Sequence, residues 1–276
     1  MIFKKEVITS RNNNTVKWVC SLHSKKGRDE NGSFFAEGIK LVKEAISASL
    51  PVTHIFIAES KKELYFDDLA RLLDEYNMPE VEVVLLADEV FEKISTENAP
   101  QGVLSIIKYL DFFSYIDIIY KEDFFLRSDE KAIILCSVRD PSNLGSAIRS
   151  ALAFGVDRII LSDDCADIYN PKTVRSAMGS IFRVKATRVK SLAELIPAIR
   201  DAGRRVFSAE LSDNAISLND AGLSSSDCVI IGNEGHGIPE NISSLCDASV
   251  YIPISKKTES LNAAVAAAIF MWEQNK

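Results

Sequence analysis

Residues 229–240 read Val-Ile-Ile-Gly-Asn-Glu-Gly-His-Gly-Ile-Pro-Glu, and residues 250–262 read Val-Tyr-Ile-Pro-Ile-Ser-Lys-Lys-Thr-Glu-Ser-Leu-Asn. Each stretch begins with a short apolar run typical of a buried strand and continues into a polar loop. Glycines in the first loop allow tight turns and a close approach of the backbone to a ligand. Polar loops at the ends of neighbouring strands form ligand sites in α/β sheets. Two ordinary strand-to-helix turns would give the same composition, so this pattern alone leaves both interpretations open.

A third segment favours a ligand site over two ordinary strand-to-helix turns. Residues 140–156 read Asp-Pro-Ser-Asn-Leu-Gly-Ser-Ala-Ile-Arg-Ser-Ala-Leu-Ala-Phe-Gly-Val and follow the apolar run 132–138. With these three blocks in this order, residues 130–276 resemble the SpoU/TrmH family of RNA ribose 2′-O-methyltransferases, part of the SPOUT superfamily. Three ordered motifs form a far more specific signal than one short pattern. A weaker resemblance to the family's N-terminal substrate-binding domain covers the preceding residues.

The alternation of strands and helices predicts an α/β protein with two domains. We expect a small α/β domain over residues 1–110, a linker over 111–128, and a second domain over 129–276. Continuous apolar strands separated by helices indicate that the second domain has a parallel sheet covered on both faces. The resemblance implies that the first domain binds RNA and that the second is a SPOUT methyltransferase domain with a deep trefoil knot. The strand pattern itself shows no knot, and general connection rules would argue against one.

The residue pattern also predicts individual elements. It predicts helices at 9–26, 40–49, 62–77, 88–95, 143–154, 171–178, 191–202, 239–245 and 260–274. It predicts strands at 34–38, 54–58, 81–86, 103–110, 132–138, 158–162, 181–185, 204–209, 227–232 and 250–254, and a loop at 28–32.

Composition indicates an ordinary globular protein of 276 residues, with 47% hydrophobic and 26% charged residues. No apolar run approaches the roughly 20 residues that cross a bilayer, and the N-terminus lacks the apolar core of a signal peptide. The five cysteines are widely spaced and form no C-x-x-C pair. This spacing argues against disulfides and a zinc site and favours a cytoplasmic location. No metal is expected.

The formal net charge is −7, whereas nucleic-acid-binding domains usually present a basic surface. Basic side chains are concentrated in residues 1–30, and residues 59–98 are strongly acidic. If the protein binds RNA, we expect the phosphates to meet the N-terminal face. A solvated surface explains such a basic stretch equally well. The residues expected to bind RNA are Arg11, Lys25, Lys26 and Arg28.

Arg149 is the first candidate catalytic residue. The apolar stripe of its helix faces the core, and Arg149 lies off that stripe. This placement suits a group that awaits an anion such as an RNA phosphate, and equally a plain surface arginine. The resemblance assigns the arginine at this position to catalysis, usually as the base. Because a guanidinium does not readily lose its proton, orienting the ribose and stabilising the developing alkoxide are physically easier roles.

Four further residues are candidates by the same resemblance. Asn143 and Glu234 lie at positions that the family places in the active site, although Asn143 would also serve as a helix cap and Glu234 as a solvated turn residue. Ser260 and Asn262 belong to the third motif and are themselves possible caps of the last helix. The family binds S-adenosylmethionine largely through main-chain groups. The corresponding cofactor-binding positions are Gly232, Ile252 and Leu261.

The sequence therefore predicts transfer of a methyl group from S-adenosylmethionine to a ribose 2′-hydroxyl of structured RNA, with 23S rRNA as the expected substrate. DNA lacks this hydroxyl and is not expected as a substrate, and no membrane partner is expected. The family's dimerisation through the knot region implies a homodimer. Three alternatives stay open: a tRNA methyltransferase, an antibiotic-resistance rRNA methyltransferase, and a non-catalytic RNA-binding or ribosome-assembly factor.

Overall fold

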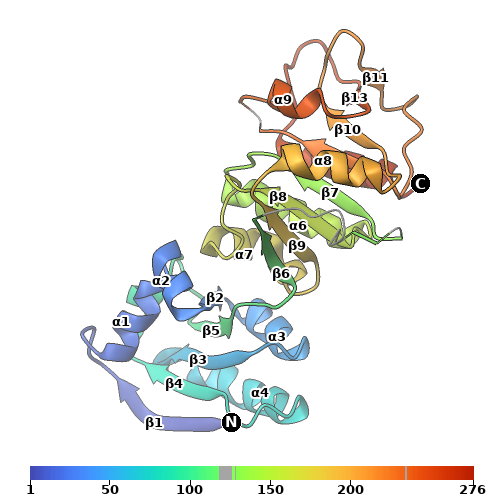
Figure 1. Ribbon diagram of the computed structural model, residues 1–276. Coiled ribbons are helices and arrows are strands. Elements are labelled where there is room, and N and C mark those ends of the chain that lie inside the picture. Colours follow the sequence, from blue (N-terminus) through green and yellow to red (C-terminus); the bar gives the residue numbers. More distant parts are fainter. Residues whose placement is uncertain (118–125, 128, 234) are drawn as a thin grey trace. The chain divides into compact units, whose positions relative to one another are not determined.

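The computed structural model of the protein describes residues 1–117, 126–127, 129–233 and 235–276. The chain divides into two compact units, each with its own sheet (Figure 1). The first unit comprises Met1–Leu110 together with Asp167–Phe182, and the second comprises Asp111–Ala166 together with Arg183–Lys276. The helical segment Asp167–Phe182, called the excursion below, thus belongs to the first unit although the residues before and after it belong to the second. Nothing in the strand and helix pattern of the sequence indicates this excursion.

The first unit is a five-stranded mixed sheet in the order β1-β4-β3-β5-β2. β4 is parallel to β1 and β3, whereas β5 is antiparallel to β3 and β2. The strands are β1 Ile2–Ile8, β2 Ser33–Glu37, β3 Val52–Ala58, β4 Glu82–Leu86 and β5 Val103–Lys108. The helices are α1 Asn14–Ser21, α2 Lys25–Asn31, α3 Ile39–Ser47, α4 Lys62–Glu75, α5 Asp88–Ile94 and α7 Pro171–Ala177, with 3-10 turns η1 Glu59–Lys61 and η3 Met178–Phe182.

Local signals divide the single helix expected at 9–26 into two helices. The side chain of Ser24 caps α2 by accepting a hydrogen bond from the Gly27 amide at 3.1 Å, as serine commonly does at helix starts. A Cβ atom on Gly27 would lie 2.0 Å from the Ser21 carbonyl oxygen, so the close contact between the helices requires glycine. Gly32 ends α2 in the left-handed conformation. The prediction of a loop at 28–32 is therefore wrong, because most of these residues form the end of α2.

Arg28 is buried at this corner, with 1% of its surface exposed. Its Nη1 donates to the carbonyl oxygens of Leu22 at 2.7 Å and His23 at 3.0 Å, and its Nη2 pairs with Asp167. The two carbonyl groups lie at the C-terminal end of α1, where backbone acceptors lack helical partners. Arg28 therefore stabilises the turn between α1 and α2 and links it to the excursion. The expectation that it contacts RNA is corrected by this burial.

We expect Arg28→Ala to lower the free energy of unfolding by roughly 3 kcal/mol, because it removes one partner of a buried ion pair and leaves buried carbonyls unpaired. Chemical denaturation of the purified protein measures the change. Lys26→Ala, at an exposed position of the same helix, is the matched control and should change stability by no more than about 0.5 kcal/mol. Equal stabilities of the two variants would contradict the structural role of Arg28.

The second unit is an eight-stranded sheet in the order β11-β13-β10-β12-β7-β8-β9-β6, and every described pair is parallel. The strands are β6 Phe113–Ile116, β7 Ala132–Leu135, β8 Arg158–Ser162, β9 Lys185–Val189, β10 Val206–Ala209, β11 Ile216–Ser217, β12 Cys228–Ile231 and β13 Ala248–Tyr251. The helices are α6 Pro141–Ala153, α8 Leu192–Asp201, α9 Glu240–Ser243 and α10 Ala263–Glu273. The strand expected at 181–185 is wrong, because Ile181 and Phe182 are buried in η3 and the strand begins at Lys185.

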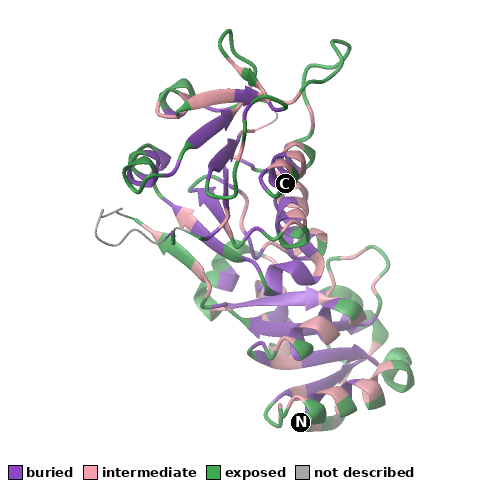
Figure 2. Cartoon of the chain, turned by 90° about the vertical axis from the view of Figure 1, so that its right-hand side faces the viewer, coloured by how far each residue is buried: buried purple, intermediate pink, exposed green. Residues whose placement is uncertain are grey.

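Burial follows the layered arrangement expected of a parallel sheet (Figure 2). The strands β7 and β12 are buried at every position, as expected for strands covered on both faces. The helix α10 contacts α6 and β12. All five cysteines are free thiols. In the described part of the chain, no helix is long and apolar enough to cross a bilayer.

Candidate active site

Three polar loops meet at one edge of the second sheet. They follow β7, β12 and β13, and the sheet order places these strands close together, with β10 between β12 and β13. Parallel strands end at the same edge, so the loops after them lie side by side. The site predicted from sequence motifs far apart in the chain is thus brought together by strand order.

A cavity of about 630 Å³ opens among the loops after β10, β12 and β13. The three residues expected to bind the cofactor, Gly232, Ile252 and Leu261, all line it, as does the candidate catalytic residue Ser260. Apolar side chains form much of the remaining wall, including Ile231, Val250 and Phe270. The volume and the mixture of apolar side chains with strand-end backbone fit a nucleoside carrying an amino-acid chain, which is the chemistry of S-adenosylmethionine.

The glycine loop after β12 is closed by its own backbone. Asn233 and Gly237 exchange two backbone hydrogen bonds, of 3.2 and 2.8 Å. A Cβ atom on Gly232 would lie 2.5 Å from the carbonyl carbon of Gly237, so this turn requires glycine at position 232. Glu234, a candidate catalytic residue in this loop, lies outside the described residues.

A side-chain hydrogen bond joins the first and third motifs. The amide nitrogen of Asn262 donates to the side-chain oxygen of Asn143 at 2.8 Å. The Asn262 side-chain oxygen also caps α10 by accepting from the amide of Ala264 at 2.9 Å. The cap of α6 is Asp140, which accepts from the amide of Asn143 at 3.0 Å. Asn143 therefore does not cap its helix with its side chain, whereas Asn262 both caps and bridges.

Arg149 lies on the exposed side of α6, and its guanidinium forms no hydrogen bond or ion pair with any residue that the structure describes. Ser260 is also exposed, at the end of the loop that leads into α10. An exposed guanidinium without a protein partner is available to an anionic ligand. Among the described residues, no side-chain bond of Arg149 competes with this role.

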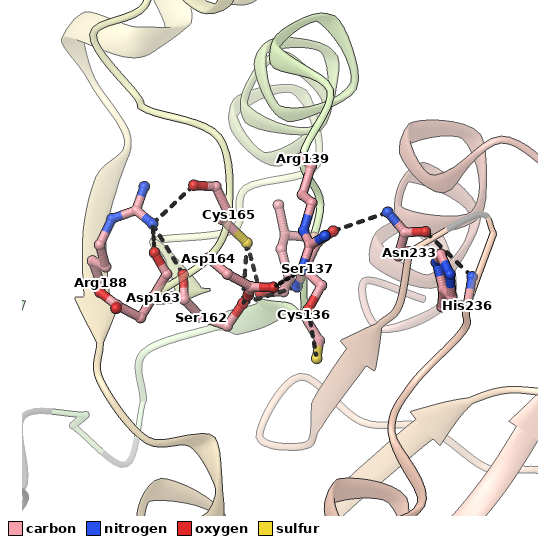
Figure 3. A network of polar contacts seen from close by, with 11 residues as sticks. Cys136, Ser137, Arg139, Ser162, Asp163, Asp164, Cys165, Arg188, Asn233 and His236 are labelled. Carbon is pink, nitrogen blue, oxygen red and sulfur yellow. Dashed lines mark hydrogen bonds and ion pairs between the residues drawn. The ribbon is translucent and has the colours of Figure 1, made fainter. Parts of the chain in front are cut away.

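A polar network beneath the site involves residues that the sequence motifs did not single out (Figure 3). Asn233 donates from its side chain to the carbonyl oxygen of Ser137 at 3.0 Å and accepts from the Gly235 amide at 2.8 Å. Ser137 has a φ of 57°, an uncommon conformation for a residue other than glycine. Asn233 therefore ties the loop after β12 to the strained first residues of the loop after β7. The position of Asn233 between two motif glycines is a signal that could have indicated it.

The same network continues to the loop after β8. The amide of Ser137 donates to the Ser162 hydroxyl at 2.8 Å, and that hydroxyl donates to Asp164 at 2.7 Å. Asp164 also pairs with Arg139 at 2.8 Å. The guanidinium of Arg188 donates to the carbonyl oxygens of residues 162, 163, 165 and 166, at 2.7 to 3.0 Å. The loops after β7, β8 and β12 are thereby held in one hydrogen-bonded arrangement.

The carboxylate of Asp164 is stabilised in its ionised form. Partial burial raises its pKa, but hydrogen bonds from Arg139, Ser162 and Ser137 outweigh burial and lower the pKa to about 2. The ordinary value is about 3.9. Because the folded-state pKa is depressed, the stabilisation by Asp164 is fully present above the unfolded-state pKa and is lost as the pH falls toward the folded-state value.

We therefore expect Asp164→Asn to reduce the free energy of unfolding by a constant amount above about pH 5, and by a shrinking amount below about pH 4. Denaturant unfolding of both proteins, from about pH 7 down to the lowest pH at which both stay folded, measures this difference. Asp163→Asn, with an exposed neighbouring carboxylate, serves as the control and should show no such trend. A difference that grows toward acid pH would contradict the assignment.

The residues expected to bind RNA lie in the first unit and differ in exposure. Arg11, Lys25 and Lys26 are exposed, whereas Arg28 is buried as described above. Arg11 donates to the Glu89 carbonyl oxygen at 3.1 and 3.2 Å, which fixes its side chain at the surface. The basic residues around α2 therefore offer exposed ammonium groups at two of the predicted positions.

Comparison with known proteins relates both parts of the chain to RNA modification. The SpoU rRNA Methylase family model matches residues 130–272, and the MRM3-like substrate binding domain model matches residues 13–105. The chain is 29% identical to the 23S rRNA (guanosine(2553)-2′-O)-methyltransferase RlmP of Bacillus subtilis, over 97% of this chain and 98% of that protein. It is also 29% identical to the 23S rRNA (uridine(2479)-2′-O)-methyltransferase of Streptomyces viridochromogenes, over 96% of this chain and 90% of that protein. The crystal structure of an AdoMet-bound rRNA methyltransferase from Sinorhizobium meliloti superposes with a TM-score of 0.80 at 28% identity, over 98% of this chain and 97% of that one.

Proposed function

The chain belongs to the SpoU rRNA methylase family, and from this premise we propose that it transfers a methyl group from S-adenosylmethionine to a ribose 2′-hydroxyl of 23S rRNA. The observation that carries the proposal is the hydrogen bond between Asn143 and Asn262, which joins two motif helices beside the cavity lined by Gly232, Ile252 and Leu261. We favour 23S rRNA over tRNA because the two relatives named above, similar over nearly the whole chain, bear names of 23S rRNA enzymes.

The cavity supplies binding and orientation for the cofactor. When bound, S-adenosylmethionine supplies an electrophilic methyl group on a sulfonium. Backbone groups at Gly232, Ile252 and Leu261 hold the nucleoside, because main-chain donors and acceptors at strand ends recognise a base without a charged side chain. The apolar wall excludes water from the transferred group. No residue of this set needs a metal ion.

Arg149 orients the acceptor ribose and stabilises the negative charge that develops on its 2′-oxygen. Its guanidinium keeps its proton at neutral pH, so its contribution is electrostatic and geometric rather than that of a base. Asn143 and Asn262 fix the start of α6 and α10 on either side of the reacting atoms. Ser260 and Glu234 complete the proposed catalytic set. The methyl–sulfur bond would break as the methyl–oxygen bond forms, so that S-adenosylhomocysteine leaves and the 2′-hydroxyl proton passes to water. Holding donor and acceptor in line supplies much of the rate enhancement in such a transfer.

The first unit docks the RNA, and the second unit carries out the transfer. Residues 113–116, which lie within the expected linker 111–128, form β6 in the sheet of the second unit. The match of residues 13–105 to a substrate binding domain supports this division. Arg11, Lys25 and Lys26 contact phosphates, and this local basic face accounts for RNA binding by a chain of net charge −7. The 2′-hydroxyl distinguishes RNA from DNA, so DNA is not a substrate.

The protein acts as a homodimer in the cytoplasm, with a trefoil knot in the second unit. An apolar groove between α6 and α10 supports the dimer, because Val265 and Trp272 remain 48% and 53% exposed there. Exposed apolar patches of this kind mark interfaces, and a second copy of the chain is the partner that the family membership implies. The contact of the C-terminal helix α10 with β12 and α6 is compatible with the knot. Light scattering that reports a monomer at micromolar concentration would contradict the dimer.

We expect Arg149→Ala to reduce methyl transfer by at least about 100-fold, the cost of removing one charge-stabilising group. The assay transfers labelled methyl from S-adenosylmethionine to total RNA from a strain that lacks the protein, with the modified nucleotide mapped. Arg183→Ala, another exposed arginine of the second unit, is the control and should retain transfer. Because the Arg149 side chain forms no hydrogen bond or ion pair with described residues, the variant should keep its stability and its calorimetric affinity for S-adenosylmethionine. Loss of folding in Arg149→Ala would instead assign the residue a structural role.

Reversing the charge of Lys25 and Lys26 to glutamate should weaken RNA binding at least tenfold and flatten the dependence of log affinity on log salt, because fewer counterions are released. The control is the double reversal of Lys61 and Lys62, two exposed lysines of the same unit outside the proposed face. Filter binding or fluorescence anisotropy with a 23S rRNA fragment, at several salt concentrations, measures both quantities. Equal losses in the two double variants would refute a specific docking face.

A further inference from the structure

Glu210 follows the last residue of β10 and lines the candidate cofactor cavity. Its Oε1 accepts two hydrogen bonds, one from the Ser208 hydroxyl and one from the Ser249 hydroxyl, both at 2.9 Å. Ser208 and Ser249 are paired across β10 and β13, and their hydroxyl oxygens lie 3.0 Å apart. The carboxylate is therefore fixed through one of its two oxygens by neighbouring strands of the sheet.

The other carboxylate oxygen, Oε2, has no hydrogen-bond or ionic partner among the residues that the structure describes. Glu210 is half-buried, and a carboxylate removed from water usually pairs with a cation or uses both oxygens. Two serine hydroxyls that anchor Oε1 restrict the rotamers of this side chain before any ligand arrives. Such preorganisation is typical of a binding group.

The position of Glu210 in the sheet indicates what it binds. β10 pairs with β12 so that Ala209 lies beside Ile231, and the next residues are Glu210 and Gly232. An acidic residue thus ends the strand adjacent to the strand that leads into the glycine loop. In dinucleotide-binding sheets, an acidic residue at the end of the neighbouring strand accepts hydrogen bonds from the ribose hydroxyls of the bound nucleotide. Here the acidic residue precedes the glycine loop in sequence, so the familiar sequence spacing is absent.

We propose that Glu210 binds the vicinal 2′- and 3′-hydroxyls of the adenosine ribose of S-adenosylmethionine. The inference rests on the proposed function and adds a charged side-chain contact to the main-chain contacts proposed for the cofactor. Glu259 also lines the cavity but lies on an exposed loop, and no serine pair anchors it among the described residues. Of these two acidic residues, only Glu210 has a carboxylate that serine hydroxyls hold in place before a ligand binds.

The test compares the binding of three ligands to the full-length protein by isothermal titration calorimetry. S-adenosylmethionine is the complete cofactor, 5′-methylthioadenosine keeps the diol but lacks the amino-acid group, and the 3′-deoxy analogue of methylthioadenosine lacks one hydroxyl. Glu210→Gln keeps the size of the side chain and removes its charge. Glu259→Gln removes the same charge elsewhere on the cavity and is the matched control.

We expect Glu210→Gln to lower the affinity for S-adenosylmethionine and for methylthioadenosine by the same factor, roughly tenfold, as for loss of a charged hydrogen-bond acceptor. Glu259→Gln should bind both like the wild type. On the wild type, the 3′-deoxy analogue should bind more weakly than methylthioadenosine, a result that needs no variant. An unchanged affinity in Glu210→Gln would overturn the proposal, as would a loss for S-adenosylmethionine alone, which would assign Glu210 to the amino-acid group. A wild type that binds no S-adenosylmethionine would refute the proposed function itself.

Discussion

The parallel pairing of β7 with β12 is the constraint on which the site depends. Leu135 lies beside Ile231, and the Cys136 amide donates to the Ile231 carbonyl oxygen at 2.8 Å. Two segments nearly a hundred residues apart therefore end together, and their loops meet directly. The hydrogen bond from Asn233 to the strained Ser137 then fixes these two loops relative to one another. A shift of register in this pair would separate the glycine loop from the helix that carries Arg149.

The side chains around the site combine local structural tasks with chemistry. Asn262 caps α10 with its oxygen and reaches Asn143 with its nitrogen, so one residue starts the last helix and links it to α6. Glu210 uses one carboxylate oxygen to bind two serines of the sheet, and we propose that the other binds the cofactor. Both terminal nitrogens of the Arg28 guanidinium bond within the fold, whereas the Arg149 guanidinium bonds to no described residue. Burial and side-chain partners, more than residue type, distinguish Arg28 from Arg149, for which we propose a role in catalysis.

Sequence reasoning predicted most strands and helices because buried apolar runs and helical spacing depend on neighbouring residues. Gly232, Ile252 and Leu261, which the resemblance assigns to one cofactor site, line a single cavity, since motif resemblance encodes long-range proximity. Sequence reasoning missed the burial of Arg28, because its partner Asp167 lies 139 residues away in an excursion without a local signal. The network through Ser162 and Asp164 was missed for the same reason. Neither residue belongs to a sequence motif, and both join the network only because β8 pairs with β7 in the sheet.

We propose that S-adenosylmethionine occupies the cavity at the ends of β10, β12 and β13, beside the pair formed by Asn143 and Asn262. The decisive measurement is a crystal structure of the protein grown with S-adenosylmethionine. We expect density for the nucleoside against Gly232, Ile252 and Leu261, with the methyl group toward Asn143 and Arg149. Density for the cofactor at another edge of the sheet, or a methyl group directed away from α6, would contradict it.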